Sequence, residues 1–376
     1  MKLSIFKSAC SAIAALVVFD STFVEAMQPD PSRNPGHSPS TSITSQVSEN
    51  ENYVDFCRAL NDAAQIMDRQ GLYVDLGNRP VMVVGDLHGD IISLEACLTK
   101  FQDFLSKNPE ATLVFLGDYV DRGPNSVQIL KTLAELKITF PDRVYLIRGN
   151  HEDTSSHVYN YYGLSDELLR TFPEEIPQTQ TIPGELNSFF NALPVYITRG
   201  NYHFMHGCIP LRLLYSPYNY FPIVPNSHKG VLPIPKERIV SILKSEDTTA
   251  EISESVAGPL DKSELINQIL WNDPTDLPTA KSGNRGNWAS YTVPFSKIKE
   301  FVAKDNGIIV RAHSTEAFNK FLSPEIPLYN IFSSYFAFMN IPVISSPLRT
   351  KKGDPRLIIR PLTAAPVASV LEINSE

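Results

Sequence analysis

The sequence predicts an α/β fold in which short buried strands alternate with amphipathic helices. Three apolar runs, VMVV at 81–84, LVFL at 113–116 and VYLI at 144–147, have the length and composition of buried strands, and segments with helical spacing separate them. Strands and helices in alternation, joined by short connections that contain glycine, indicate a sheet with parallel strands. Each run is followed by residue types that bind metals, which is where open α/β sheets place reactive groups.

The first 26 residues have the pattern of a secretory signal peptide. Lys2 and Lys7 provide the basic start, residues 9–19 the apolar core, and the tripeptide VEA at 24–26 a cleavage site. The apolar core is too short to cross a bilayer, which takes about 20 residues, so we expect no stable membrane insertion. The pattern predicts removal of residues 1–26 and a secreted or periplasmic protein, with a cytoplasmic location as the alternative.

Residues 27–50 are predicted to be a disordered linker. They are rich in Pro, Ser, Thr and Asn and contain almost no large apolar groups, so they cannot bury enough surface to offset their ordering entropy. We expect one folded domain over residues 51–362, followed by a C-terminal tail at 363–376.

The folded domain is expected to begin with a helix and to continue with helices between the strands. Each helix is predicted from apolar residues at helical spacing. The predicted helices span residues 53–69, 91–104, 126–136, 166–171 and 186–192.

The second half of the chain is predicted to contain a hairpin, a long connection and further strands. Residues 194–198 and 202–205 form the hairpin, and 208–262 is an insertion or long excursion that could lie over a site. GIIVRA at 307–312 is another strand, followed by His313. The segments LYNIF, IPVIS and RLIIR alternate apolar and polar residues, which suggests antiparallel strands.

The composition is that of a globular protein without a basic surface. The chain of 376 residues has a net charge of −8, and its first basic run is RTKK at 349–352. Sequence-independent binding of nucleic acid needs clustered Lys and Arg, so we expect no nucleic-acid partner. Beyond the signal segment, Cys57, Cys97 and Cys208 have no zinc-finger spacing and leave a single disulfide open without indicating its pairing.

Six residues that follow apolar strands have side chains that bind metals. They combine carboxylate and amide oxygens with imidazole nitrogens, a donor set that suits Mn, Fe or Zn better than Ca or Mg. Six donors are too many for one tetrahedral ion. With one shared carboxylate they fit two divalent ions about 3.5–4 Å apart, which would activate a bridging water for in-line attack at phosphorus. The six are Asp86, His88, Asp118, Asn150, His206 and His313.

Four neighbouring residues fit chemistry on a phosphate. Arg122 and Arg285 could hold phosphate oxygens with their fork-shaped guanidinium groups. His151 could protonate a leaving oxygen, and Asp121 could orient its imidazole. Three other histidines are interpreted as structural or surface residues: His157, His203 and His228.

Three blocks of the sequence carry a family resemblance. GDLHGD at 85–90, FLGDYVDRG at 115–123 and LIRGNHE at 146–152 resemble the signature blocks of the PPP-type serine/threonine protein phosphatases, within the calcineurin-like metallophosphoesterases. The resemblance covers residues 53–362. Later matches follow in the family's order: MHG at 205–207, ILWNDP at 269–274, SYT at 290–292, RAH at 311–313 and IFSS at 331–334.

The resemblance implies an α/β (α+β) fold with a β-sandwich flanked by helices, rather than a doubly wound sheet. The reaction that it implies is direct attack on phosphorus by a hydroxide that bridges two metals. In the family's pattern, Asp86 and His88 would bind the first metal, Asp118 would bridge, and Asn150, His206 and His313 would bind the second, while His151 with Asp121 would be the acid and Arg122 and Arg285 would bind phosphate.

Three departures from the family's pattern affect substrate selection. Cys208 stands where the family has a second Gly after the histidine of the MHG block. The block with a Pro-Asn-Tyr is missing after the IFSS segment, and Tyr335 is the candidate for its phosphate-facing tyrosine. The 55 residues from 208 to 262 are longer than the family's connection and unlike it, so residues that select a substrate cannot be transferred.

We therefore expect a dimetal phosphoprotein phosphatase. Its partner would be a protein with phosphoserine or phosphothreonine, phosphotyrosine being left open, and the sequence indicates no regulatory subunit. One alternative is a diadenosine polyphosphate hydrolase of the same fold, which would use the same metals and Arg122 on a pyrophosphate. Another is a catalytically inactive phosphoprotein-binding module. That alternative predicts replaced ligands, yet the six ligands and His151 are all present.

Overall fold

The computed structural model divides the chain into a segment at Met1–Asn52 and a compact unit at Tyr53–Glu376. The predicted signal peptide and linker lie outside the residues that it describes, as do Tyr335, His157 and His228. The described residues are 52–154, 163–176, 183–213, 231–245, 261–283, 285, 287, 290–314, 326–334, 357–361 and 369–374.

One five-stranded sheet carries the three apolar runs of the first half of the chain. Its order is β14-β15-β2-β3-β4. β2, β3 and β4 are parallel, as predicted, whereas β15 runs antiparallel to both β2 and β14. The strands are β2 (Val81–Val84), β3 (Thr112–Phe115), β4 (Val144–Leu146), β14 (Leu357–Pro361) and β15 (Ser369–Ile373).

A second five-stranded sheet carries the later histidines. Its order is β1-β5-β6-β12-β13. β5 and β6 form the predicted antiparallel hairpin, and β12 lies parallel between β6 and β13. The strands are β1 (Tyr73–Asp75), β5 (Tyr196–Arg199), β6 (Tyr202–Phe204), β12 (Ile308–Arg311) and β13 (Leu328–Asn330).

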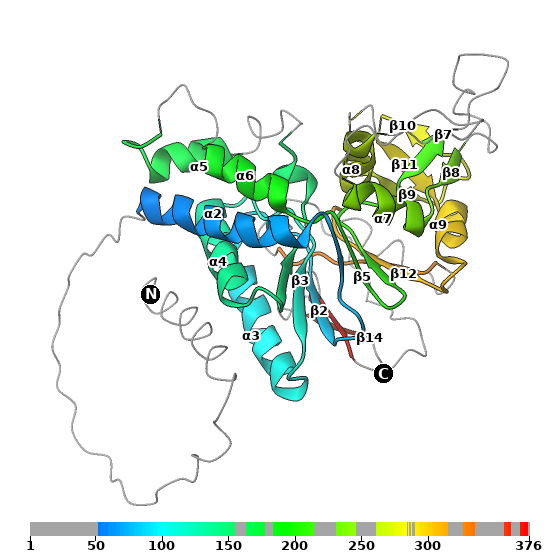
Figure 1. The fold of residues 1–376 in the computed structure, drawn as a ribbon, viewed down its shortest axis with the longest axis horizontal. Coiled ribbons are helices and arrows are strands. Elements are labelled where there is room, and N and C mark those ends of the chain that lie inside the picture. Colours follow the sequence, from blue (N-terminus) through cyan, green and yellow to red (C-terminus); the bar gives the residue numbers. More distant parts are fainter. Residues whose placement is uncertain are drawn as a thin grey trace, which may run out of the picture. The chain divides into compact units, whose positions relative to one another are not determined.

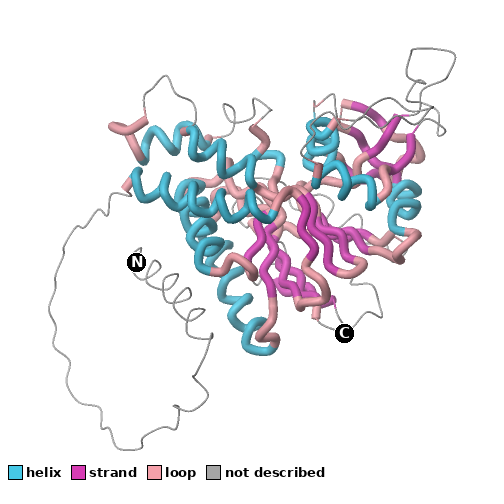
Figure 2. The backbone as a smooth tube through the Cα atoms, viewed as in Figure 1, coloured by secondary structure: helices cyan, strands magenta, loops and turns pink. Residues whose placement is uncertain are grey.

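The two sheets pack face to face around a shared apolar core. Val83 and Val114 of the first sheet belong to one buried cluster with Phe204 and Val310 of the second. All four side chains are fully buried, which is the largest favourable contribution that such residues make to folding. The mixed α/β fold and the β-sandwich are confirmed (Figure 2).

Helices cover the outer faces of the sandwich (Figure 1). α3 and α4 contact the first sheet, and α2 packs against α4 and α6. Residues of α7, α8 and α9 form a second apolar cluster with residues of the other sheet, such as Ile309. The helices are α2 (Tyr53–Gln70), α3 (Ile91–Lys107), α4 (Ser126–Thr139), α5 (Leu164–Thr171), α6 (Gly184–Ala192), α7 (Lys236–Lys244), α8 (Lys262–Trp271) and α9 (Phe295–Val302).

Two carboxylates fix the helices that begin beside the strand ends. Asp90 caps α3, because its side chain accepts a hydrogen bond from the N–H of Ser93 at 3.1 Å. The first turn of α4 is capped from another helix: the N–H groups of Ser126 and Val127 donate to the carboxylate of Glu167 at 2.9 and 3.0 Å. Both helix starts are therefore held directly after the loops that follow β2 and β3.

The predicted long excursion contains regular structure where it is described. β7 (Leu211–Leu213) and β8 (Val231–Pro233) pair antiparallel, and α7 follows them. After α8 comes a small three-stranded sheet of order β10-β11-β9. Its strands are β9 (Asp273–Thr275), β10 (Lys281–Ser282) and β11 (Tyr291–Pro294).

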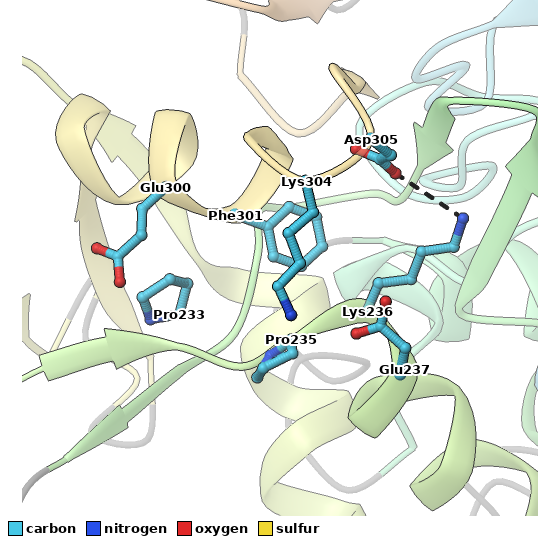
Figure 3. Close-up of a pocket in the computed structure, with 8 residues that line it drawn as sticks. All are labelled: Pro233, Pro235, Lys236, Glu237, Glu300, Phe301, Lys304 and Asp305. Carbon is cyan, nitrogen blue, oxygen red and sulfur yellow. Dashed lines mark ion pairs between the residues drawn. The ribbon is translucent and has the colours of Figure 1, made fainter.

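A small pocket of about 160 Å³ lies between α7 and α9 (Figure 3). Pro233 and Phe301 form part of its wall, and Lys236 reaches Asp305 across one side of it at 4.0 Å. Asp305 precedes β12, whereas His313 follows that strand. The pocket therefore lies at the end of β12 opposite to His313.

The C-terminal part of the chain differs from the prediction in two respects. The tail predicted at 363–376 is wrong for Ser369–Ile373, because this segment is the strand β15 and pairs on both sides. The segment LYNIF was expected to be antiparallel, but β13 runs parallel to β12, since the connection between them is long enough for a crossover. The segment RLIIR contributes most of β14, which pairs antiparallel with β15 as expected. The segment IPVIS lies outside the described residues.

The three cysteines of the folded unit are buried free thiols, so no disulfide joins Cys57, Cys97 and Cys208. In the part of the chain that the structure describes, none of the helices combines the length and the apolar character needed to cross a membrane.

Candidate metal centre

The six predicted ligands come together where five strands end. Asp86, Asp118 and Asn150 follow β2, β3 and β4 of the first sheet. His206 follows β6 and His313 follows β12 in the second sheet. All six side chains, including His88, are at least nine-tenths buried, so the sandwich delivers donors from both sheets to one enclosed edge.

Asp118 is the centre of this group because its two carboxylate oxygens face different histidines. Oδ1 lies 3.3 Å from Nε2 of His206, and Oδ2 lies 3.4 Å from Nε2 of His88. Asp86 joins the His88 side, with 3.9 Å between its Oδ2 and the same Nε2. One carboxylate is therefore shared between two sets of donors, as a bridging ligand would be.

The donors on the His206 side lie within contact distance of one another. Nε2 of His206 lies 3.0 Å from Oδ1 of Asn150 and 3.1 Å from Nδ1 of His313. Oδ1 of Asn150 lies 2.7 Å from Nδ1 of His313. Such a convergence of lone pairs is the arrangement that a cation would hold.

Backbone carbonyls set the tautomers of two histidines. Nδ1 of His88 donates to the carbonyl of Val120 at 3.0 Å, and Nδ1 of His206 donates to the carbonyl of Leu116 at 2.8 Å. In the neutral ring each Nε2 therefore presents a lone pair to the site. Nε2 of His88 is buried and has no hydrogen-bond partner among the described residues, as expected of an atom that binds a metal.

The charges of the site also fit divalent metal ions. Burial and the neighbouring Asp118 carboxylate raise the pKa of Asp86 to about 6. Burial and the positive field of Arg122 hold the pKa of His88 well below its usual range, and burial with Arg285 does the same to the pKa of His313. Two buried carboxylates beside the neutral imidazoles of His88 and His313 are a donor set that a cation would stabilise.

Unfavourable backbone conformations are concentrated at this site. His88, Asp118, Asp121, Arg122 and His313 all have positive φ, between 45° and 73°. Non-glycine residues adopt this region at a cost, and such residues cluster at functional sites. The strain is localised in the loops that carry the predicted side chains.

Close contact between two glycines brings the loops after β3 and β4 together. Gly117 has φ of +102°, and a Cβ atom on it would lie 2.4 Å from the backbone N of Gly149. A Cβ atom on Gly149 would lie 2.2 Å from the N of Asp118. Only glycine fits at both positions, and this approach places Asn150 beside Asp118.

His151 and Asp121, which are predicted to act together as the acid, are in direct contact. Nδ1 of His151 lies 2.7 Å from Oδ2 of Asp121. Nε2 of the same ring lies 4.0 Å from Oδ2 of Asp118 and 3.4 Å from Nη2 of Arg122. Burial opposes the charged imidazole, but Asp118 and Asp121 outweigh it and raise the pKa of His151.

Arg122 and Arg285 reach the centre through different neighbours. Arg122 is exposed and reaches His151. Nε of Arg285 donates to Oδ2 of Asp273 at 2.7 Å, and that oxygen is 3.8 Å from Nε2 of His313. The structure thus brings both arginines to the site, whereas Tyr335 lies outside the described residues.

The buried carboxylate of Glu152 was not among the predicted site residues. It accepts hydrogen bonds from the backbone N–H groups of Asp118, Tyr119 and Gly149 at 2.8, 2.8 and 2.9 Å. Burial raises its pKa to about 7. Its place directly after Asn150 and His151 in the LIRGNHE block was the available signal.

Asp273 and Trp271 were also missed, although both lie in the ILWNDP block. Asp273 binds Arg285 and also accepts from Nη2 of the buried Arg311 at 2.9 Å. Nε1 of Trp271 donates to Oδ2 of Asp153 at 3.1 Å, which connects α8 to the turn that carries Asn150. These side chains hold the loops that present the predicted ligands.

His203, interpreted as a structural residue, does not join the centre. Its Nδ1 lies 2.6 Å from the hydroxyl oxygen of Tyr196, and its Nε2 lies 3.0 Å from Oδ2 of Asp305. The ring is buried, and His203 is the central residue of β6, whereas His206 follows the end of that strand.

Comparison with known proteins finds relatives that are similar in sequence and a solved structure that is similar in fold. Two relatives are named as candidate serine/threonine-protein phosphatases. The one from Encephalitozoon cuniculi is 29% identical over 206 residues, which cover 54% of this chain and 36% of the relative. The one from Caenorhabditis elegans is 32% identical over 197 residues, which cover 52% of this chain and 42% of the relative. The matches thus span well under half of the relatives' own length.

A solved structure and a family model extend the match. The structure of a serine/threonine phosphatase from Saccharomyces cerevisiae, described as similar to human phosphatase PP5, superposes with a TM-score of 0.50 at 21% identity. It covers 74% of this chain and 76% of that one, which shows the shared fold. The family model of the calcineurin-like phosphoesterases matches residues 79–316. The chain therefore belongs to the calcineurin-like phosphoesterase family.

Proposed function

We propose that the protein is a metal-dependent phosphoprotein phosphatase that hydrolyses phosphoserine and phosphothreonine monoesters. One observation carries the proposal. The two oxygens of Asp118 face separate donor sets, and the His151–Asp121 pair lies beside them. The names of the two relatives support a protein substrate. The ILWNDP block also favours a protein substrate over a dinucleotide.

Asp86, His88 and Asp118 would hold one divalent ion, and Asp118, Asn150, His206 and His313 would hold the other. The family uses two divalent metals, and the mixed oxygen and imidazole donors suit Mn, Fe or Zn. When bound, the ions supply charge stabilisation at phosphorus and an activated water.

The other side chains would handle the phosphate and the proton. Arg122 and Arg285 carry guanidinium groups that suit phosphate oxygens. Asp121 holds Nδ1 of His151, so Nε2 is directed toward Asp118 and Arg122 and can hold the proton that the leaving oxygen takes. A raised pKa keeps that imidazole protonated at higher pH.

Hydrolysis of p-nitrophenyl phosphate with added Mn²⁺ tests the proposal. Wild type and the exposed-site control Asp55→Asn should hydrolyse it, and Asp118→Asn should be slower by about 10³-fold or more, because it weakens both metal sites. Equal rates for wild type and Asp118→Asn would refute the proposal.

Competition between a phosphopeptide and diadenosine tetraphosphate then separates a phosphatase from a pyrophosphate hydrolase. Peptides with phosphoserine, phosphothreonine or phosphotyrosine report which phosphorylated residue the enzyme prefers.

The proposal extends to the place of action, which would be outside the cytoplasm. It is supported by the basic start, the apolar core and the small-residue cleavage site within residues 1–26. N-terminal sequencing of the secreted form should begin after Ala26. Recovery of the chain with an intact Met1 from the cytosol would overturn this part of the proposal.

A further inference from the structure

The loop that carries Arg285 is attached to helix α8 by a pair of asparagines. Nδ2 of Asn287 donates to Oδ1 of Asn267 at 2.8 Å, and Nδ2 of Asn267 lies 3.4 Å from Oδ1 of Asn287. Each amide therefore faces the other with donor against acceptor. Asn267 lies in α8, and Asn287 lies two residues after Arg285.

The described residues of this loop, Gly283, Arg285, Asn287 and Ser290, are tied at several backbone positions. The N–H of Gly283 donates to the carbonyl of Ser290 at 3.0 Å, which closes the base of the loop. The hydroxyl of Ser290 donates to the carbonyl of Asn287 at 2.8 Å. The adjoining Tyr291 donates its N–H to Oδ1 of Asn272, the residue after Trp271 in sequence, at 2.6 Å.

Arg285 itself has few direct restraints. Its Nε donates to Asp273, and its other N–H groups make no hydrogen bond with the described residues. The side chain is 38% exposed. Its backbone has φ of +50°, a conformation that costs energy for a residue other than glycine. The surrounding loop must therefore maintain the position from which the guanidinium meets a phosphate.

Helix α8 is a suitable support, because it also contacts the metal centre. Trp271 at its end donates to Asp153, and the Trp271 ring lies 6.2 Å from the ring of His313, centroid to centroid. Its inner face, with Leu265 and Ile269, is fully buried. A side chain anchored on α8 is thereby fixed relative to His313.

We propose that the amide pair Asn267·Asn287 is a positioning element that holds Arg285 in place to bind the phosphate of the substrate. The inference rests on the proposed function, since it takes Arg285 as a phosphate ligand. It assigns no contact with substrate to either asparagine. Their effect passes through Arg285, so it should vanish when the guanidinium is removed.

A double-mutant cycle tests this on the Mn²⁺-loaded chain, with the Kd of inorganic phosphate measured by calorimetry and kcat/KM measured on p-nitrophenyl phosphate. Asn267→Ala and Asn287→Ala should each weaken phosphate binding about fivefold to tenfold, the effect of a lost hydrogen bond. Neither should weaken it further in the Arg285→Ala background. Asn267→Asp keeps the acceptor for Nδ2 of Asn287 and should stay within about twofold of wild type.

Asn201→Ala is the matched control, because it also removes an amide hydrogen bond, to the carbonyl of Asn306 at 2.9 Å, at the far end of β6. It should leave the Kd of phosphate unchanged. The positioning role would be overturned if Asn287→Ala weakened phosphate binding equally with and without Arg285, or if the Kd of phosphate were unchanged in both asparagine variants. In either case, hydrolysis by the wild type would still support the proposed function. Absence of hydrolysis and of phosphate binding in wild type would overturn both.

Discussion

The imidazole of His151 and the carboxylate of Asp121 are joined at 2.7 Å, between Nδ1 and Oδ2. Oδ1 of the same carboxylate accepts the N–H of Leu164, at the start of α5, at 3.0 Å. Asp121 is thus held from both sides and fixes the ring so that Nε2 is directed toward Asp118. Among the described residues, Asp121 forms hydrogen bonds with Ser126, His151 and Leu164 and with none of the six predicted ligands, so its function can be separated from metal binding.

Asp121→Asn should lower kcat by about 10–100-fold and leave the metal content unchanged. The amide cannot stabilise a protonated imidazole as the carboxylate does, so less of the acid form would be present at neutral pH. Steady-state kinetics with metal analysis of the same sample is the measurement. A parallel loss of metal would show instead that Asp121 supports the ligands.

His206→Gln and His203→Gln form a matched pair, since both residues are buried and they lie only three positions apart, His203 within β6 and His206 just after it. His206 faces Asp118, Asn150 and His313, so its loss should leave about one metal per chain instead of two. His203→Gln should retain two. Plasma mass spectrometry of dialysed protein measures the ratio, and equal metal content in the two variants would contradict the assignment.

His203 should make the folded state sensitive to acid. Burial lowers its pKa to about 4, against the raising effect of Asp305, and Tyr196, Phe301 and Lys236 complete its surroundings. Between pH 6.5 and 4 the unfolded chain binds more protons at this position than the folded chain, so the free energy of unfolding falls as the pH falls.

When the pH is lowered from 7.5 to 5, the titration of His203 should lower the free energy of unfolding by about 1–2 kcal/mol. Chemical denaturation of wild type and His203→Gln at both pH values measures the difference. The pH dependence should be smaller in the variant. A variant with the same loss between the two pH values would assign the acid sensitivity to other groups.

Glu152→Gln should destabilise the fold by about 2–3 kcal/mol, because three backbone N–H groups donate to its buried carboxylate. A glutamine replaces one of the two acceptor oxygens with an NH₂ group that opposes an N–H. Thermal unfolding followed by circular dichroism is the measurement, with the exposed Glu110→Gln as control. Equal melting temperatures in the two variants would exclude this structural function.

The repeated pattern of an apolar run followed by polar residues was sufficient to predict the strands at 81–84, 113–116 and 144–147 and the position of Asp86, Asp118 and Asn150 directly after them. The reason is that a buried parallel strand needs several consecutive apolar residues, and such runs are visible in one dimension. The helices at 53–69, 91–104 and 126–136 were predicted for a related reason, since their apolar faces repeat at helical spacing. β15 was missed because its apolar segment VLEI is too short to show a clear period.

The sequence by itself determined which residue types follow each strand and therefore the chemistry that the chain can support. The tertiary structure decided which of them meet: it places His206 and His313 from the second sheet against Asp118 from the first, and keeps His203 away from them. It also decided the supports, since Glu152, Asp273 and the Asn267·Asn287 pair act through contacts between segments far apart in the chain or through backbone N–H groups. Such contacts depend on how the two sheets pack, and no local pattern of residues encodes that packing.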